Sequence, residues 1–288
     1  GIHAFSATSG RFREAAVRAR MLDGRGKIII TNPSRRAQVP ADEFPDLEHI
    51  IIVGDASDLD AGELSWNAAM AEASDTLAVE WVDREDPLLI VYTAGEDDRP
   101  IGLVHVHDAM RGYLMTARWV LDLREGDVLW TQAQPGWLMS VVYSAFAPWL
   151  CGATSFITGK VHDAETIYRH IEQQQVSVIY TIPTVYRILA AAGEAAPARF
   201  NLKSLRHLAS VVEPLYPDLI YTIMRILGLP LYDTWWTAET GMITIANFPC
   251  LPIKPGYLGK PFPGVTAAVF DAAMQPVPFF TMGSLALQ

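Results

Sequence analysis

The residues that could do chemistry in this 288-residue chain do not form any of the commonest short motifs. The patterns GxxxxGKS/T, GxGxxG, HExxH and GxSxG are all absent, so the phosphate-loop, dinucleotide-binding, zinc-protease and serine-hydrolase interpretations lose most of their support. Acidic oxygens could instead hold a divalent cation, and a loop of hydroxyls and backbone amides could hold phosphates. The segments that offer such groups are YTAGEDDRPIGLVH (92–105), SVVEPLYP (210–217), YDTWWTAETG (232–241) and KPGYLGKPFPG (254–264).

Short apolar runs and helical patterns alternate along most of the chain and must position these segments. Continuous apolar runs such as HIIIVGD (49–55) and PLLIVYT (87–93) are typical of parallel strands that are covered on both faces. Alternation of strands and helices at this spacing predicts an α/β fold with mainly parallel, helix-covered sheets. We expect further strands at 27–31, 127–131, 154–157, 176–180, 204–211 and 230–232, and helices at 11–22, 107–120, 163–174, 184–192 and 216–227.

The pattern changes after Phe248, where Pro and Gly residues punctuate the chain. Beyond them, VTAAVF (265–270) and SLALQ (284–288) have the pattern of antiparallel strands in a smaller sheet or barrel. We therefore expect an α/β core over 1–248, made of two packed sheet subdomains, and the start of a β subdomain over 249–288. Both ends look cut from a longer protein, because the chain begins just before a helix and stops within a strand pattern.

Composition and charge exclude several classes of protein. Half of the residues are apolar and 19% are charged, which excludes a disordered or fibrous chain. The net charge is −10 and there is no basic block, so we expect no nucleic acid as a partner. Cys151 and Cys250 lie far apart without a CxxC pair, which favours free thiols in a reducing compartment. The sequence has neither an apolar run of about 18 residues nor a signal-peptide core, so we expect a cytoplasmic protein with no membrane partner.

Taken together and in this order, the four segments resemble the AMP-forming acyl-CoA synthetases, and in particular the acetyl-CoA synthetase branch. That family has a strand running into a Gly-, Ser- and Thr-rich loop that ends in Lys-Pro-Lys-Gly, then a Gly-Glu-Pro turn, and then Asp-Thr-Trp-Trp-Gln-Thr-Glu-Thr-Gly. The segment WTQAQPGWLMSVVYSAFAPWLCGAT (130–154) is also similar to a helical part of the family. The resemblance runs from about residue 11 to the end, and it implies the AMP-binding core of the adenylate-forming N-terminal domain for 1–248.

This resemblance implies an enzyme that makes an acyl-adenylate from a carboxylate and Mg-ATP, and then transfers the acyl group to CoA. Mg²⁺ would be the cofactor, and ATP, a short carboxylate and CoA would be the small-molecule partners. The family's ribose-binding aspartate, its hinge and its C-terminal domain with the adenylation lysine have no counterpart in this sequence. We therefore expect the fragment alone to be inactive.

The resemblance also assigns residues to a nucleotide site. Glu239 matches the glutamate that holds Mg²⁺ against the ATP phosphates, a role that suits a hard anionic oxygen. A solvated loop carboxylate is the alternative interpretation of Glu239. Thr93 matches the beginning of the phosphate loop and, with Glu239, is a candidate catalytic residue. The candidate nucleotide-binding residues are Thr93, Gly95, Glu213, Pro214, Asp233, Thr234 and Trp235.

A pocket for the acyl group is implied by the same family pattern. Trp236 matches the tryptophan that limits the acetate branch to short carboxylates, although an ordinary core aromatic would look the same in the sequence. Leu138 and Met139 stand where the family has a smaller Val-Thr pair that lines this pocket, and Val211 completes the expected lining.

Several family residues around the nucleotide are replaced in this chain. Glu96, Asp97 and Asp98 replace Ser-Thr-Gly in the phosphate loop, and Ile101 replaces its last lysine. These carboxylates would repel a triphosphate, which needs hydrogen-bond donors and positive charge. The remaining replacements are Val212 for the glycine of Gly-Glu-Pro, Ala238 for a threonine, and Gln134 for an aspartate.

Two functions therefore stay open from the sequence. The first is an acetyl-CoA synthetase-like ligase whose handling of phosphate has diverged. The second is a catalytically degenerate pseudoenzyme that acts as a binding or regulatory module, because the acidic loop and Ala238 depart from the family. Neither interpretation sets the oligomeric state.

Overall fold

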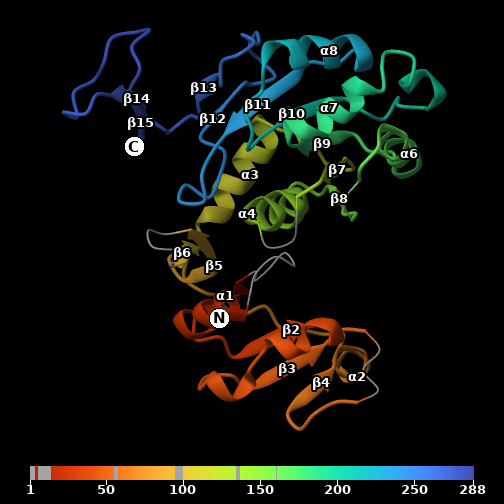
Figure 1. Ribbon diagram of the computed structural model, residues 1–288, viewed down its shortest axis with the longest axis vertical. Helices are drawn as coiled ribbons and strands as arrows, with labels where there is room; N and C mark the ends of the chain where they lie inside the picture. The colour runs from red at the N-terminus through yellow and green to blue at the C-terminus, as the bar shows by residue number, and fades with distance from the viewer. Residues whose placement is uncertain (1–3, 6–13, 55–57, 95–99, 134–136, 160) are drawn as a thin grey trace. The chain divides into compact units, whose positions relative to one another are not determined.

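The computed structural model describes residues 4–5, 14–54, 58–94, 100–133, 137–159 and 161–288 (Figure 1). The chain forms two compact units, each with its own sheets and helices. The first unit comprises Gly1–Asp108 with Pro135–Trp137, and the second comprises Ala109–Gln134 with Leu138–Gln288.

The described residues of the first unit form two three-stranded sheets. In one sheet the order is β2-β3-β4 and the strands are parallel, which agrees with the apolar runs IIIT and HIII that form β2 and β3. In the other the order is β1-β5-β6, with β1 parallel and β6 antiparallel to β5. The elements are β1 (Ala4–Phe5), α1 (Glu14–Asp23), β2 (Ile28–Thr31), the 3₁₀ helices Pro33–Gln38 and Ala41–Glu43, β3 (His49–Ile52), β4 (Glu63–Ser65), α2 (Trp66–Glu72), β5 (Pro87–Ala94) and β6 (Pro100–Val106).

A seven-stranded sheet with the order β13-β12-β11-β10-β9-β7-β8 forms the centre of the second unit. Strands β7 to β11 are parallel, whereas β12 pairs antiparallel with β11 and β13 pairs antiparallel with β12. The predicted α/β class with mainly parallel sheets is therefore confirmed. The strands are β7 (Val128–Thr131), β8 (Thr154–Phe156), β9 (Val178–Thr181), β10 (His207–Ser210), β11 (Leu231–Trp235), β12 (Ile245–Ala246), β13 (Lys260–Pro261), β14 (Ala267–Phe270) and β15 (Ser284–Leu287), and the helices are α3 (Ala109–Trp119), α4 (Leu138–Val141), the π-helix η4 (Val142–Phe146), α5 (Ala147–Leu150), α6 (Ala164–Gln174), α7 (Pro183–Ala191), the 3₁₀ helix Pro197–Arg199 and α8 (Pro217–Leu227).

The strand order reverses at β7, because β8 lies on one side of β7 and β9 on the other. Right-handed crossovers then place helices on both faces of the sheet. Helices α7 and α8 lie on one side of β9, β10 and β11, while α3 and α4 lie on the other (Figure 1). In an open α/β sheet of this kind, ligands bind at the carboxyl ends of the parallel strands.

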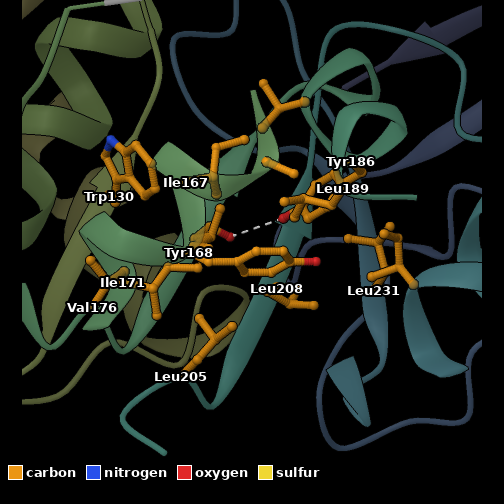
Figure 2. Close-up of a cluster of buried hydrophobic side chains, with 14 of the residues drawn as sticks. Trp130, Ile167, Tyr168, Ile171, Val176, Tyr186, Leu189, Leu205, Leu208 and Leu231 are labelled. Carbon is orange, nitrogen blue, oxygen red and sulfur yellow. Dashed lines mark hydrogen bonds between the residues drawn. The ribbon is translucent and has the colours of Figure 1, made fainter. Parts of the chain in front are cut away.

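A buried apolar cluster lies between the large sheet and helices α6, α7 and α8 (Figure 2). Ile171 of α6 and Leu189 of α7 pack in this cluster with Leu208 of β10 and Leu231 of β11. Full burial of each such side chain stabilises the fold by about 1.5–3 kcal/mol. This core holds the strands whose carboxyl ends carry the candidate site.

Most of the predicted elements lie within two residues of their expected positions, as with α6 at Ala164–Gln174 and β5 at Pro87–Ala94. The strand predicted at 204–211 is shorter, because the backbone N–H of Leu205 turns back to the carbonyl of Leu202 and β10 begins at His207. Strands β1, β4, β6, β12 and β13, helix α2 and the 3₁₀ helices were not predicted.

The residues after Phe248 contribute to two sheets. Strand β13 pairs with β12 at the edge of the large sheet, and β14 pairs antiparallel with β15, as predicted for 265–270 and 284–288. The domain boundary predicted between 248 and 249 falls inside the second unit and stays a prediction.

Two predictions from composition can be compared with the described residues. Neither cysteine is part of a disulfide in the described part of the chain, with Cys151 buried and Cys250 exposed, as expected for free thiols. None of the helices within the described ranges is long and apolar enough to cross a membrane.

Candidate functional site

Two of the candidate nucleotide segments lie side by side at the carboxyl edge of the large sheet. β10 ends at Ser210 and β11 ends at Trp235. Ser210 pairs with Asp233 in the parallel ladder between these strands, so the turn at 211–214 and the residues after Asp233 leave the sheet at neighbouring positions. The fold thus brings together segments that helix α8 separates in the sequence.

The turn after β10 is a γ-turn centred on Val212. The backbone N–H of Glu213 donates to the carbonyl of Val211 at 2.9 Å, and Val212 has a φ of 77°. A γ-turn with positive φ is rare and strained, above all for a β-branched residue, and such strain costs about 1–3 kcal/mol. Glycine, which the resemblance leads one to expect here, adopts this conformation freely. The turn therefore has a glycine-type backbone although it carries a valine.

Glu213 is anchored to the amino terminus of helix α7. Its carboxylate accepts the backbone N–H of Thr184 at 3.0 Å, the hydroxyl of Thr184 at 2.7 Å and a guanidinium N–H of Arg187 at 2.6 Å. A carboxylate at a helix N-terminus is also favoured by the helix dipole. These contacts fix the turn against α7, and the exposed Pro214 follows directly. The nucleotide-binding role of Glu213 and Pro214 stays a prediction.

Asp233 is buried beside this turn and is 7% exposed. Its Oδ1 accepts the backbone N–H of Thr234 at 3.0 Å, and its own N–H donates to Oδ1 of Asn247 at 3.1 Å. Burial raises the pKa of Asp233 to about 7, although the hydrogen bond from Thr234 opposes this shift. Near neutral pH the carboxyl is therefore partly protonated and can donate as well as accept a hydrogen bond.

Two further hydroxyls lie in one row with Asp233 across the sheet. Thr181 pairs with Ser210, and Ser210 pairs with Asp233, so the three side chains point to the same face. Thr181 and Ser210 are buried, and neither hydroxyl has a hydrogen-bond partner within the described part of the chain. A buried hydroxyl without a partner costs about 1–3 kcal/mol. These hydroxyls are therefore candidates to contact a ligand or water at this edge.

Trp236 is held by a chain of hydrogen bonds that begins on the opposite face. Its indole Nε1–H donates to the hydroxyl of Tyr180 at 3.0 Å. The hydroxyls of Tyr180 and Thr234 are 2.8 Å apart, and the Thr234 hydroxyl donates to the carbonyl of Ser210 at 2.8 Å. Thr234 and Trp236, predicted for two different subsites, are therefore linked through Tyr180.

A π-helix brings a second tyrosine to Trp236. Such turns are rare and often occur at functional sites, and η4 contains Tyr143. The ring of Tyr143 meets the rings of Tyr180 and Trp236 edge to face, with centroid distances of 5.2 and 5.4 Å. Its hydroxyl lies 2.9 Å from the hydroxyl of Thr116 and accepts the N–H of Ile243 at 3.0 Å. Burial raises the pKa of Tyr143 above its ordinary value, so the hydroxyl stays neutral.

The other residues predicted for the acyl pocket are buried in the second unit. Leu138 and Met139 begin α4, about one helical turn before Tyr143. Val211 is buried directly after β10. That these side chains line one pocket with Trp236 stays a prediction.

Glu239 lies in a turn after β11 and is exposed. Thr237 and Thr240 close this turn, because the Thr237 N–H donates to the Thr240 hydroxyl and the Thr240 hydroxyl donates to the Thr237 carbonyl, each at 3.1 Å. The preceding Trp235 ends β11, and its carbonyl accepts the N–H of Thr244 at 3.1 Å. Among the described residues, no group of three or more His, Cys, Asp or Glu could hold a metal ion.

The AMP-binding enzyme family matches residues 3–288 of the chain. The chain belongs to this family. It is 41% identical over 277 residues to acetyl-coenzyme A synthetase of Bacillus subtilis (strain 168), a match that covers 96% of the chain and 48% of the relative. It is 32% identical over 303 residues to acetyl-coenzyme A synthetase of Escherichia coli (strain K12), covering 96% of the chain and 46% of the relative. The chain therefore spans about half the length of these curated relatives.

Solved structures of adenylate-forming enzymes have the same fold as this AMP-binding family member. The Brucella canis acyl-CoA synthetase matches with a TM-score of 0.85 and 27% identity, over 96% of this chain and 51% of that one. The anthranilate CoA ligase AuaEII, whose structure contains anthranoyl-AMP, matches with a TM-score of 0.84 and 25% identity, over 97% of this chain and 54% of that one.

The phosphate loop expected of an AMP-binding enzyme is described only in part. Thr93 lies on β5 in the first unit, where it pairs with Ile101 of β6. Its approach to the residues of the second unit stays a prediction. The predicted residues that lie outside the described ones are Gly95, Glu96, Asp97, Asp98 and Gln134.

The predictions from sequence missed Tyr180, Tyr143, Thr184 and Arg187. Tyr180 could have been found, since a tyrosine at the end of the strand-like run VSVIYT buries its ring and must find a partner for its hydroxyl. Pro183 followed by Thr184 is a helix-start signal, but nothing local indicates that Glu213 of a distant turn bonds there.

Proposed function

We propose that this chain forms the nucleotide- and acyl-binding part of an AMP-forming acyl-CoA ligase of the acetyl-CoA synthetase type. In the proposed reaction, a carboxylate oxygen of a short acid attacks the α-phosphorus of ATP, and pyrophosphate leaves to give an acyl-adenylate. The deprotonated thiol of CoA then attacks the acyl carbon, and AMP leaves as the thioester forms. The similarity to acetyl-coenzyme A synthetases and to a CoA ligase that holds anthranoyl-AMP supports this chemistry.

One observation carries the proposal. The Val212 turn and the end of β11 lie beside each other at the carboxyl edge of a parallel sheet, where such sheets bind ligands. The turn supplies backbone groups held in place by Glu213, and β11 supplies the carboxyl of Asp233. In the proposed complex these groups contact the adenine and ribose, while Trp236 limits the space for the acyl chain.

Mg²⁺ fits this arrangement through Glu239. The side chain is an exposed carboxylate on a turn held by hydroxyl and backbone hydrogen bonds. Mg²⁺ in nucleotide sites is commonly held by one or two carboxylates together with phosphates and water, so a larger cluster of protein ligands is not needed. When bound, the ion would offset the charge of the ATP phosphates. Glu239 would then supply one oxygen ligand and orient the ion.

Titration calorimetry on the 288-residue chain tests the proposal. We expect a non-hydrolysable acetyl-adenylate analogue to bind in the micromolar range. The isosteric Glu239→Gln variant should bind Mg-ATP about tenfold more weakly, as loss of one charge-assisted contact implies. Its affinity for the analogue should not change, because the analogue lacks the phosphates that share the metal. Equal Mg-ATP affinity of both proteins would contradict the metal role. Absence of analogue binding would contradict the ligase.

A non-catalytic binding module is the second candidate function. The strained valine in the Val212 turn favours it, together with Ala238 and the acidic residues of the phosphate loop. A module of this kind would bind neither Mg-ATP nor the adenylate analogue. Restoring Ser, Thr and Gly at 96–98 and Lys at Ile101 distinguishes the two candidates, because in a diverged ligase this change should raise Mg-ATP affinity most strongly at low salt.

A further inference from the structure

A buried chain of hydrogen bonds fixes the indole of Trp236 to the backbone of β10. It runs from Trp236 Nε1 to the Tyr180 hydroxyl, then to the Thr234 hydroxyl and then to the carbonyl of Ser210, with distances of 3.0, 2.8 and 2.8 Å. Tyr180 and Ser210 are fully buried, and Thr234 is almost so. Water therefore has little access to the two bonds among Tyr180, Thr234 and Ser210, whereas the bond from Trp236 is part-buried.

The chemistry of the two ends sets the direction of every bond. The indole N–H of Trp236 can only donate, and the carbonyl of Ser210 can only accept. Thr234 gives its proton to Ser210, so Tyr180 must give its own proton to Thr234. The lone pair of the Tyr180 oxygen then faces the indole N–H. This chain of hydrogen bonds from Trp236 to Ser210, called the relay below, thus has one arrangement of its protons. It selects one orientation of the Trp236 ring.

Contacts with the ring of Tyr143 support the same orientation of the Trp236 indole. Tyr143 meets both Trp236 and Tyr180 edge to face, with interplanar angles of 71° and 86°. Its own hydroxyl is tied to Thr116 and to the N–H of Ile243. The indole is therefore held at its nitrogen by Tyr180 and at its ring by Tyr143.

We propose that Tyr180 is a positioning residue that sets the length of acyl chain the site accepts, by locking the orientation of Trp236. This inference rests on the proposed function, in which Trp236 limits the acyl pocket. Tyr180 lies on β9, outside the segments that the family resemblance assigns to the substrate. Removing its hydroxyl leaves the indole N–H without its acceptor, so the ring gains freedom to turn and admit a longer chain.

Tyr180→Phe is the test variant, and Tyr186→Phe is its matched control. Tyr186 is also fully buried in this unit, and its hydroxyl donates to the carbonyl of Ala209 at 3.0 Å. Both changes delete one buried tyrosine oxygen, but only Tyr180 bonds to Trp236. A general loss of stability would therefore appear in both variants.

The first measurement follows the indole N–H of Trp236 by ¹H–¹⁵N NMR, with the resonance assigned by its loss in Trp236→Phe. In Tyr180→Phe we expect this resonance to shift and its exchange with solvent to become about tenfold faster, as loss of one hydrogen bond implies. In Tyr186→Phe both should match the starting protein. An unchanged resonance in Tyr180→Phe would overturn the proposed lock.

The second measurement compares the affinities of acetyl-, butyryl- and hexanoyl-adenylate analogues. The starting protein and Tyr186→Phe should bind the analogues more weakly as the chain lengthens. Tyr180→Phe should improve hexanoyl relative to acetyl binding by about tenfold, since each accommodated methylene contributes a few-fold. If the Trp236 indole is released in Tyr180→Phe but the dependence of affinity on acyl-chain length does not change, the role of Tyr180 in specificity is overturned.

Thr234 provides a second pair of variants if Tyr180→Phe does not fold. Thr234→Val interrupts the relay at its next bond, and Thr234→Ser restores the hydroxyl. In the valine variant the indole N–H resonance of Trp236 should shift and exchange faster, and in the serine variant it should return to its starting position. Identical spectra of the two variants would overturn the relay. If no protein binds any analogue, the proposed function and the chain-length role both fail, while the indole spectra still decide whether Tyr180 positions Trp236.

Discussion

The two edges of the seven-stranded sheet differ in how their polar groups are satisfied. At the amino edge, Arg206 binds Asp122 and Asp127, and Ser177 donates to Asp127 at 2.8 Å. Burial raises the pKa of Asp127, but hydrogen bonds from Arg206, the backbone of Arg124 and Ser177 outweigh it, so the pKa lies below its ordinary value. The charged groups at this edge are therefore paired, although Nε2 of the buried His207, where β10 begins, has no hydrogen-bond partner within the described ranges.

The carboxyl edge also has a paired carboxylate, Glu213 with Arg187, but it adds strained and unpartnered groups. Val212 has a strained positive φ, Asp233 is buried with a raised pKa, and the hydroxyls of Thr181 and Ser210 have no partner among the described residues. Each of these features destabilises the folded state. The same strands therefore carry the Arg206 ion pairs at one edge and, at the other, a strained turn and hydroxyls that are left available. This asymmetry is expected if ligand contacts lie at the carboxyl ends of the strands.

The largest expected effect comes from breaking the amino edge. Arg206→Met keeps the aliphatic stem but leaves Asp127, whose side chain is 10% exposed, without its main partner. We expect the free energy of unfolding in urea to fall by about 3 kcal/mol, the lower end for a buried pair, because the Arg206 side chain is 27% exposed. Binding of the adenylate analogue to the folded protein should not change.

An exposed ion pair provides the control for this variant. Arg225 and Glu194 are 3.2 Å apart, and their side chains are 60% and 68% exposed. Arg225→Met should therefore change the free energy of unfolding by less than about 1 kcal/mol. Similar losses for the two variants would mean that the amino edge has no special role in stability.

The next effect concerns Asp233 and pH. Its folded pKa of about 7 lies above the ordinary 3.8, so the folded state holds a proton that the unfolded state has lost. Protonation of Asp233 in the folded state therefore contributes to the free energy of unfolding. This contribution is complete below about pH 4 and is lost as the pH rises through 7. Relative to Asp233→Asn, the starting protein should lose about 2 kcal/mol of unfolding free energy between pH 5 and pH 7.

The comparison with Asp233→Asn also separates this effect from that of His207. Burial lowers the pKa of His207 from 6.5 to about 4, so its stability contribution is complete above 6.5 and is lost as the pH falls towards 4. That trend has the opposite sign, and it is common to both proteins. A constant difference between the two proteins across pH 5–7, measured by urea unfolding, would show that Asp233 is ionised throughout.

The elements around these edges could largely be predicted from the sequence, because their signals are local. Apolar runs such as VSVIYT mark the strands, and Pro183 and Gly228 mark a helix start and a helix end. β6 was missed because Pro100 and Gly102 make its sequence look like a loop. α2, with seven residues, is too short for its periodicity to be recognised.

The site could be predicted only where a residue type itself carries the chemistry. Asp233 and Glu239 are predicted from the resemblance, and their roles stay predictions. The relay through Tyr180 joins three strands and cannot be read from any one segment. The bonds between Glu213 and Thr184 are non-local in the same way. The φ of Val212 could not be predicted either, since valine prefers extended backbone and the turn imposes the opposite.

A smaller effect should follow from relieving the strain at the carboxyl edge. Val212 is 61% exposed, so Val212→Gly removes little packing. Relief of the positive φ should raise the free energy of unfolding by about 1 kcal/mol after the entropic cost of glycine. Val104, which is 54% exposed on β6, offers the same change without a positive φ. Val104→Gly should destabilise by about 0.5–1 kcal/mol, and two losses of equal sign would contradict strain at Val212.

The smallest effect is expected where a buried hydroxyl has no protein partner to lose. Thr181→Val replaces the hydroxyl by a methyl group of similar size, so the free energy of unfolding should stay within about 0.5 kcal/mol or rise, because no hydrogen bond is broken. The same change at Thr116, whose buried hydroxyl bonds to Gly112 at 2.8 Å and lies 2.9 Å from Tyr143, should cost about 1–2 kcal/mol. If the Thr181 hydroxyl is kept for a ligand, Thr181→Val should weaken analogue binding even though its stability is unchanged. Equal destabilisation by the two variants would show that Thr181 already has a partner in the folded protein, and the contrast between the two edges would then rest on Val212, Asp233 and Ser210.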